Sequence, residues 1–275
     1  MKKNIGIQGI KGSFHHIVAN NFFGKEIHLA EFLSFEEMIY NLNDGKIDYA
    51  VMAIENSTAG SIIPNYALID EYDISIVGEY YLQITHNLMA LKGQSLEDIK
   101  EVQSHPMALL QCRDFFKNNS SITLVEEKDT AQIAKKIADN KLKGLGAIAS
   151  ELACKFYDLE IIKENIQTIK KNQTRFVILQ NIRPSENKNI NKASLKFELD
   201  HKRGSLATIL NVLSDCKLNL TKIQSMPKIQ TPWRYSFFVD VTFDNMEHYF
   251  KAKSIIEIMA KEFKVLGEYK NAKDD

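Results

Sequence analysis

The chain has 275 residues, and its 35 lysines and arginines balance its 35 aspartates and glutamates. Hydrophobic residues make up 44% and charged residues 25% of the chain, as in an ordinary globular protein. The balanced charge argues against nucleic acid or a membrane as a partner. No signal peptide and no apolar run of ~18 residues is found, and the three cysteines are far apart. We therefore expect a cytoplasmic protein without disulfides.

Strands and helices are predicted to alternate through residues 1–181. Short β-branched and apolar runs predict strands at 5–8, 27–33, 49–54, 101–104, 122–125, 146–150 and 177–179, with a strand-rich stretch at 74–91. Helical spacing and capping signals predict helices at 13–23, 34–42, 107–116, 129–140 and 151–157. This order indicates an α/β domain whose strands are covered by helices.

A polar, asparagine-rich segment at 182–193 interrupts the alternation and is predicted to be a linker. Beyond it we expect a strand at 194–199, a helix at 203–216, and strands at 219–226 and 233–243. A helix with Phe263 on its apolar side and a strand at 264–270 follow. The order βαββαβ is that of a ferredoxin-like unit. The sequence thus predicts two domains, 1–181 and 194–275.

Two loops carry residues suited to binding. GIKGS at 9–13 indicates either a helix N-terminus that holds an anion or a tight turn between a strand and a helix. ENSTAG at 55–60 indicates either a capped helix start or a cluster of donors at the carboxyl end of a buried strand, where open α/β sheets bind ligands. His105 has no cysteine or second histidine at metal spacing, so we expect no metal ligation there.

NQTRF at 172–176 lies where a loop meets a buried strand. The planar guanidinium of Arg175 suits a carboxylate, and the hydroxyl of Thr174 can deliver a proton within an organised site. The alternative is a surface arginine beside a threonine that simply favours the strand.

Together these blocks resemble the prephenate dehydratase family over nearly the whole chain. The matching segments are GIKGSF (9–14), IENSTAGS (54–61), SHPMALLQC (104–112), DTA (129–131), AIASELA (147–153), ENIQ (164–167) and NQTRF (172–176). The segment after the linker resembles an ACT regulatory domain, through GSL (204–206), NLTKIQSMP (219–227) and WRYSFFVD (233–240). The chain departs from the family at Met107, where glutamine is usual, and at His15, where a small hydroxyl residue is common.

The resemblance implies a two-lobed catalytic domain, similar to periplasmic-binding-protein type II lobes, with its active site in the cleft between the lobes. It implies a homodimer or homotetramer that needs neither a metal nor an organic cofactor. In this family the motif threonine, here Thr174, assists departure of the ring hydroxyl of prephenate. Arg175 would anchor the pyruvyl carboxylate and Phe176 would pack in the cleft wall. Further hydrogen bonds would come from Asn56, Ser57, Thr58 and Ser13.

The resemblance also implies that L-phenylalanine binds the ACT domain at an interface between two chains. Gly204, Ser205 and Leu206 would contact the ligand, and Asn219 and Leu220 would close the pocket. Gln224 and Met226 replace charged residues of the family, so a domain that only dimerises is the alternative. For the whole chain, an arogenate dehydratase and a non-catalytic amino-acid-sensing protein are the other hypotheses.

Overall fold

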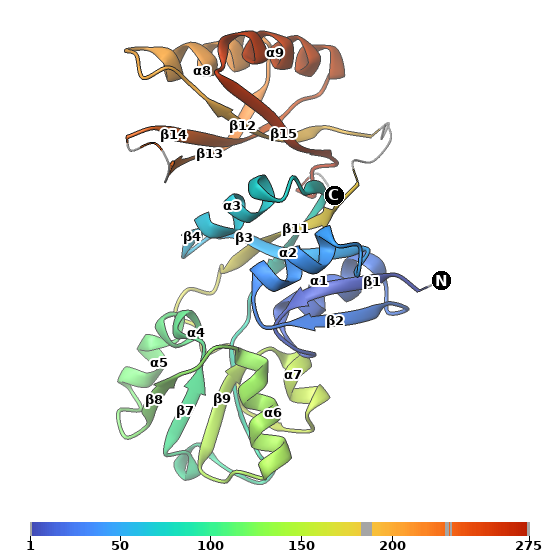
Figure 1. Ribbon diagram of the computed structural model, residues 1–275. Helices are drawn as coiled ribbons and strands as arrows, with labels where there is room; N and C mark the ends of the chain where they lie inside the picture. Colours follow the sequence, from blue (N-terminus) through green and yellow to red (C-terminus); the bar gives the residue numbers. More distant parts are fainter. Residues whose placement is uncertain (1, 183–188, 229–230, 232, 274–275) are drawn as a thin grey trace. The chain divides into compact units, whose positions relative to one another are not determined.

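The computed structural model describes residues 2–182, 189–228, 231 and 233–273 (Figure 1). Contacts between residues divide the chain into a first unit, 1–60 with 81–176, and a second unit, 61–80 with 177–275. The boundaries fall inside three strands, β4 (Gly60–Ser61), β5 (Ser75–Gln83) and β11 (Gln173–Gln180). Each unit therefore contains segments that are distant in the sequence.

The first unit begins with three parallel strands. In it, β1 (Asn4–Gln8) pairs with both β2 (His28–Phe32) and β3 (Tyr49–Asn56). Helices α1 (Phe14–Phe23) and α2 (Phe35–Asn43) connect these strands and contact β1 and β3. Ile5, Ile7 and Val51 are fully buried, as expected for parallel strands covered by helices.

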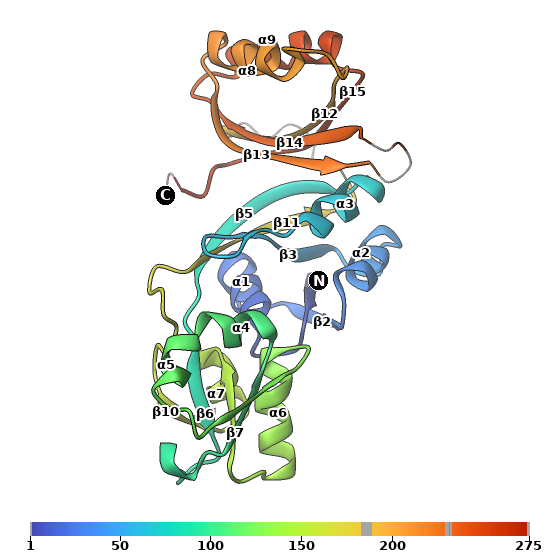
Figure 2. The same cartoon turned by 90° about the vertical axis from the view of Figure 1, so that its left-hand side faces the viewer.

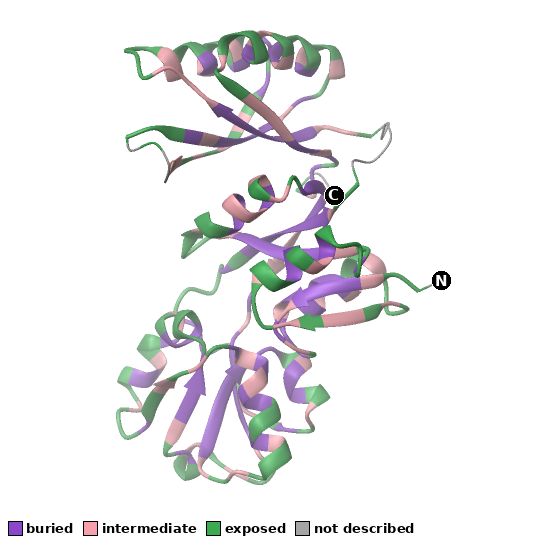
Figure 3. Ribbon diagram, viewed as in Figure 1, coloured by how far each residue is buried: buried purple, intermediate pink, exposed green. Residues whose placement is uncertain are grey.

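A five-stranded sheet forms the rest of the first unit. Its order is β10 (Glu160–Lys163), β6 (Asn87–Ala90), β9 (Leu145–Ala149), β7 (Glu101–Ser104) and β8 (Thr123–Glu126). Separate apolar clusters lie on its two faces, one with Leu88 and Ile148, the other with Met89 and Ala147. Side-chain alternation thus buries both faces, and β9 is buried throughout (Figure 3). The accompanying helices are α4 (Pro106–Gln111), α5 (Arg113–Lys117), α6 (Thr130–Asn140), α7 (Glu151–Phe156) and the 3-10 turn η1 (Leu96–Asp98).

The second unit contains the predicted βαββαβ arrangement. Its four antiparallel strands have the order β13 (Asn219–Pro227), β14 (Tyr235–Thr242), β12 (Lys192–Glu198) and β15 (Glu262–Tyr269). Helices α8 (Ser205–Asp215) and α9 (Met246–Met259) cover one face of this sheet (Figure 2). We call these strands the regulatory sheet.

Segment 61–80 belongs to the second unit although it lies far from the regulatory sheet in the sequence. It includes the end of β4 (Gly60–Ser61), helix α3 (Ile63–Glu71) and the start of β5. β15 pairs with β5 in parallel at Gly267 and Ile76. A Cβ atom at Gly267 would lie 2.2 Å from the carbonyl oxygen of Ile76, so this pairing requires glycine.

Several local predictions need correction. Phe263 is not on the last helix: α9 ends at Met259, and Phe263 lies on β15 opposite Phe197. The helix predicted at 107–116 is broken at Cys112 into α4 and α5. Of the predicted linker, residues 183–188 lie outside the described residues, and β12 begins inside it, at Lys192.

Candidate active site

Uncharged side chains join the loop after β3 to the start of β11. The Asn56 amide nitrogen donates to Thr174 Oγ1 at 2.9 Å and to Asn172 Oδ1 at 2.7 Å. The Asn56 Oδ1 atom accepts from the backbone N–H groups of Thr58 and Ala59, both at 2.9 Å, and from Thr58 Oγ1 at 2.7 Å. One asparagine side chain therefore fixes both the loop and the Thr174 hydroxyl.

Ser57 sets the register between the same two segments. Its backbone N–H donates to the Gln173 carbonyl at 2.8 Å, and its Oγ accepts from the Gln173 N–H at 2.9 Å. The structure thus brings the predicted Asn56, Ser57 and Thr58 against the predicted Thr174. These residues lie more than 110 positions apart in the sequence.

Gln111 is a central member of this network that the sequence reasoning missed. Its Nε2 donates to Thr58 Oγ1 at 2.9 Å, and its Oε1 accepts from Asn172 Nδ2 at 2.9 Å. Gln111 is the last residue of α4, whose first turn has Pro106 and is capped by His105. The SHPMALLQC block contained the signal, since the glutamine is the penultimate residue of the matched motif, but helical spacing alone does not single it out.

His86 lies behind Gln111, with its Nε2 2.8 Å from Gln111 Oε1. Burial lowers the pKa of His86, and the hydrogen bond to Gln111 opposes that effect only in part. The imidazole is therefore neutral at pH 7, and its Nε2–H donates to the acceptor oxygen of Gln111. A neutral donor thus supports the orientation of the Gln111 amide.

The three side chains of the TRF block are all buried, with 8% of Thr174, 4% of Arg175 and 1% of Phe176 exposed. The Phe176 ring lies edge-on to the His15 ring, with centroids 5.0 Å apart. Successive side chains of a strand point to opposite faces, so Thr174 and Phe176 share one face of β11 and Arg175 points to the other. Of these three residues, Thr174 is the one whose side chain joins the uncharged network, through its hydrogen bond with Asn56.

Ser13 and its loop form a tight turn. The Ser13 hydroxyl caps α1 by accepting from the His16 N–H at 3.3 Å. The Gly12 N–H donates to His16 Nδ1 at 3.0 Å, and the Gly12 carbonyl accepts from Ser150 Oγ at 2.5 Å. A Cβ atom at Gly12 would lie 2.8 Å from the Ala153 Cα. The turn interpretation accounts for these contacts, and the hydrogen bonds of Ser13 do not reach the Asn56 network.

A cavity of about 490 Å³ lies beside the network. Its polar wall includes Thr58, Gln111 and Asn172, and its other wall includes the half-exposed Met107 and Ile169. The lining also includes the charged residues Arg113, Asp114 and Lys117, so the cavity offers apolar, uncharged polar and charged groups to a small ligand. The complete lining is Thr58, Ala59, Met107, Leu110, Gln111, Arg113, Asp114, Lys117, Thr168, Ile169 and Asn172. In the parts of the chain that the structure describes, no three histidine, cysteine or acidic side chains could hold a metal ion.

The predicted effector residues fall into two groups. Gly204, with φ of 86°, precedes α8, and Ser205 and Leu206 line a cavity of about 130 Å³ together with Tyr235. Asn219 and Leu220 lie at the other end of β13, because Pro227 pairs with Tyr235 and Asn219 pairs with Thr242. Seven strand residues span about 20 Å. A single chain therefore does not bring the two groups together.

Residues 5–183 match the family model described as prephenate dehydratase. The chain belongs to the prephenate dehydratase family. It is 32% identical over 275 residues to a bifunctional chorismate mutase/prephenate dehydratase of Buchnera aphidicola. The aligned region covers 98% of this chain and 71% of that protein.

Solved structures share the fold over nearly the whole chain. A prephenate dehydratase from Arthrobacter aurescens in complex with L-Phe matches with a TM-score of 0.86 and 22% identity, over 99% of this chain and 91% of that one. GqqA, described as a quorum quenching acylase, matches with a TM-score of 0.88 and 25% identity, over 99% of this chain and 100% of that one. No helix among the residues that the structure describes is long and apolar enough to cross a membrane.

Proposed function

We propose that the chain converts prephenate to phenylpyruvate, carbon dioxide and water, as a step in L-phenylalanine biosynthesis. The bond between the ring and its carboxylate breaks, and that electron pair enters the ring as the C–O bond opposite it breaks. Hydroxide departs and leaves as water after gaining a proton. The ring becomes aromatic, so the barrier lies in expelling a poor leaving group. The reaction itself requires no redox step.

The hydrogen bond from Asn56 to Thr174 carries this proposal. Because Thr174 Oγ1 accepts from Asn56 Nδ2 at 2.9 Å, its own O–H is available to donate to the departing hydroxyl. A chain of hydrogen bonds polarises its members and strengthens that donor. Thr174 is thus proposed as the catalytic residue that assists departure of the leaving group.

An uncharged network suits this chemistry for a second reason. A cation held at the departing carboxylate would stabilise the substrate more than the transition state and would slow the reaction. The contacts around Thr174 come from amides and hydroxyls, which can orient the substrate without holding that carboxylate. Asn56, Ser57 and Thr58 are proposed to supply such contacts, and Ser13 remains a candidate at the start of α1.

Arg175 is proposed to act on the pyruvyl carboxylate, with Phe176 packed in the wall of the site. Arg175→Lys keeps the charge but loses the planar fork, so we expect KM to rise with a smaller change in kcat. An unchanged KM would contradict the anchoring role. Because Arg175 points to the face opposite Thr174, this assignment rests on the family resemblance more than on the position of the side chain.

The acylase similarity does not favour a second activity. The hydroxyl oxygens of Thr174 and Ser57 accept from an amide side chain and a backbone N–H. Among the residues that the structure describes, neither hydroxyl bonds a base that would activate it as a nucleophile. Arogenate, with an amino group in place of the ketone, is the closer alternative substrate. Measuring kcat/KM for prephenate and arogenate with the same preparation decides between them.

We further propose that L-phenylalanine regulates a cytoplasmic homodimer or homotetramer. Ser205 and Leu206 of one chain would bind the amino acid, and Asn219 and Leu220 of a second chain would close the site. The separation of the two groups within one chain supports this arrangement, as does the L-Phe complex of the Arthrobacter protein. Calorimetry with L-phenylalanine tests it, since a chain that binds no ligand at millimolar concentration would contradict regulation.

A further inference from the structure

Segment 61–80 directly follows the loop that holds Asn56 and Thr58, and it packs against one face of the regulatory sheet. Helices α8 and α9 cover the other face. Three strands contribute lysines that bind the segment, and we call these four residues the lysine face: Lys192, Lys196, Lys222 and Lys264.

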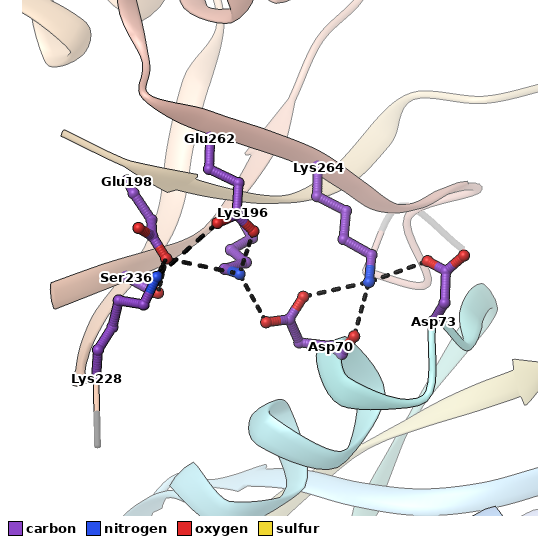
Figure 4. Close-up of polar contacts among 8 residues, drawn as sticks. All are labelled: Asp70, Asp73, Lys196, Glu198, Lys228, Ser236, Glu262 and Lys264. Atoms are coloured by element: carbon purple, nitrogen blue, oxygen red, sulfur yellow. Dashed lines mark hydrogen bonds and ion pairs between the residues drawn. The ribbon is translucent and has the colours of Figure 1, made fainter. Parts of the chain in front are cut away.

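Asp70, near the end of α3, binds two members of the lysine face (Figure 4). Its carboxylate lies 2.7 Å from Lys196 Nζ and 3.2 Å from Lys264 Nζ. Lys264 Nζ also donates to the Asp70 carbonyl at 2.7 Å and pairs with Asp73 at 2.9 Å. The contacts of Asp70 hold the carboxyl end of α3, where its dipole also favours cations. The Asp73 side chain is 68% exposed, so its pair with Lys264 contributes little.

An outer ring of charges orients Lys196 (Figure 4). Glu262 pairs with Lys196 at 2.7 Å, and Glu198 lies between Lys196 and Lys228. Burial on its own would lower the pKa of Lys196, but hydrogen bonds and the charges of Asp70 and Glu262 outweigh it and raise that pKa. Lys196 therefore remains charged beside Asp70 throughout the physiological pH range.

Lys222 holds the first residue of the segment. Its Nζ donates to Ser61 Oγ at 2.8 Å and lies 5.5 Å from the centre of the Tyr66 ring. A β-bulge positions it: Leu220 pairs with Val241 and packs on the helix-covered core, whereas Lys222 pairs with Asp240 on the opposite face. The extra residue, Thr221, re-aims the strand, as bulges beside functional sites commonly do.

Lys192 and Glu79 bind the far end of the segment. Lys192 Nζ lies 2.9 Å from both carboxylate oxygens of Glu79, and the two side chains are 3% and 0% exposed. The lysine face thus binds the segment at its first residue, at the end of its helix and near its last residue. A displacement of the regulatory sheet would have to move the segment or break these pairs.

We infer that segment 61–80 couples the regulatory sheet to the substrate loop, with Lys222 and Asp70 as positioning residues for catalysis. The inference rests on the proposed function. Ser61 is three residues from Thr58, which binds Gln111 beside the cavity. Because a misplacement of about 1 Å can cost roughly 10²-fold in rate, a small movement of Ser61 is enough to change turnover. The proposed effector residue Leu220 lies two positions from Lys222 in β13, so the path from the effector site to segment 61–80 is short.

The test compares Lys222→Met and Asp70→Asn with the matched controls Lys251→Met, on the exposed side of α9, and Asp73→Asn, which also pairs with Lys264. In the full chain we expect kcat for prephenate to fall about tenfold in the first two and to stay within twofold in the controls. The melting temperature of each variant is measured beside kcat, so that turnover is compared only between folded chains. Lys222→Arg should restore kcat, since its cation can still reach Ser61.

Unaltered kcat in folded Lys222→Met, or equal losses in Lys222→Met and Lys251→Met, would overturn the inference. If Asp70→Asn does not fold, Lys222→Met and its arginine counterpart still decide the outcome. The unaltered chain is measured in the same assay. No turnover by that chain would refute the proposed function itself, whereas turnover with indifferent variants would refute only the coupling.

Discussion

The active-site network and the lysine face fix their partners by different means. Around Thr174 the contacts are amide and hydroxyl hydrogen bonds, which carry no net charge. On the lysine face, four cations bind Ser61, Asp70 and Glu79. The substrate loses its ring carboxylate during the reaction, so a cation held at that carboxylate would stabilise the substrate more than the transition state. A segment that only has to be held can use charge pairs.

The two regions also differ in what a single replacement leaves behind. Removing one amide from the active site leaves neutral donors and acceptors, some of which can reach water. Removing one member of a buried ion pair leaves an uncompensated charge, which costs far more. We therefore expect the loss of the buried Lys192–Glu79 pair to affect folding most, and changes in the network to affect rate most.

The largest effect on stability is expected for Lys192→Met. It removes the Lys192 cation from the buried Glu79 carboxylate, and we expect about 3–5 kcal/mol to be lost from the free energy of unfolding. Urea unfolding measures this loss. Replacing Glu79 by leucine in the same chain should recover much of it, and a double variant no more stable than Lys192→Met would contradict this account of the pair.

Asn56→Asp introduces a charge into the active-site network and tests whether that network has to be uncharged. The side chain keeps its shape, but a carboxylate cannot donate to Thr174 and adds a negative charge beside a substrate with two carboxylates. We expect kcat to fall by about 10²–10³, as for loss of a preorganised donor. Asn140→Asp, on the exposed end of α6, is the control and should remain within twofold. Equal rates in the two variants would refute the role of the Asn56 amide.

The pH dependence of stability tests the burial of His15. Burial lowers the pKa of His15 to about 3, so the unfolded chain binds a proton below pH ~6.5 that the folded chain does not. Stability therefore falls as pH drops from ~6.5 towards 3, by up to about 1.4 kcal/mol per pH unit from this group. His15→Phe, between the rings of Phe35 and Phe176, should reduce that slope. The free energy of unfolding is measured in urea at pH 7 and at pH 5 for both chains. An equal loss between the two pH values in His15→Phe and in the unaltered chain would refute this assignment.

The smallest expected effect concerns regulation. Typical coupling between two sites is about 1–3 kcal/mol, or 5- to 150-fold in affinity. We expect Asp70→Asn to keep its affinity for L-phenylalanine, measured by calorimetry, while inhibition of prephenate turnover weakens about fivefold. Asp73→Asn should be inhibited like the unaltered chain. A loss of ligand binding in Asp70→Asn would instead make this residue part of the effector site.

The sequence predicted the local parts of the active site better than their connections. The strand ends at 49–54 and 177–179, and the polar motifs beside them, are local signals, and the family resemblance brought them together. Gln111 was missed because its importance comes from Thr58 and Asn172, which are more than 50 residues away. No periodic pattern reports such a contact.

The lysine face was not predictable for a related reason. Helix α3 has no side-chain cap and its apolar residues do not form one stripe, so it gave no helical signal. The bulge that turns Lys222 toward Ser61 depends on the pairing of β13 with β14. Alternation along 219–226 alone predicts a regular strand there. Helix boundaries near Cys112 and Met259 also depend on packing that periodicity does not contain.

The central claim is that the Thr174 hydroxyl, held by Asn56, assists departure of the ring hydroxyl of prephenate. The most direct measurement is the rate of phenylpyruvate formation from prephenate by the unaltered chain, Thr174→Ala and Thr174→Ser. We predict turnover by the unaltered chain, a fall in kcat of about 10²–10⁴ for alanine, and a partial recovery for serine, which keeps the hydroxyl. Near-normal kcat for Thr174→Ala in a folded chain would contradict the claim.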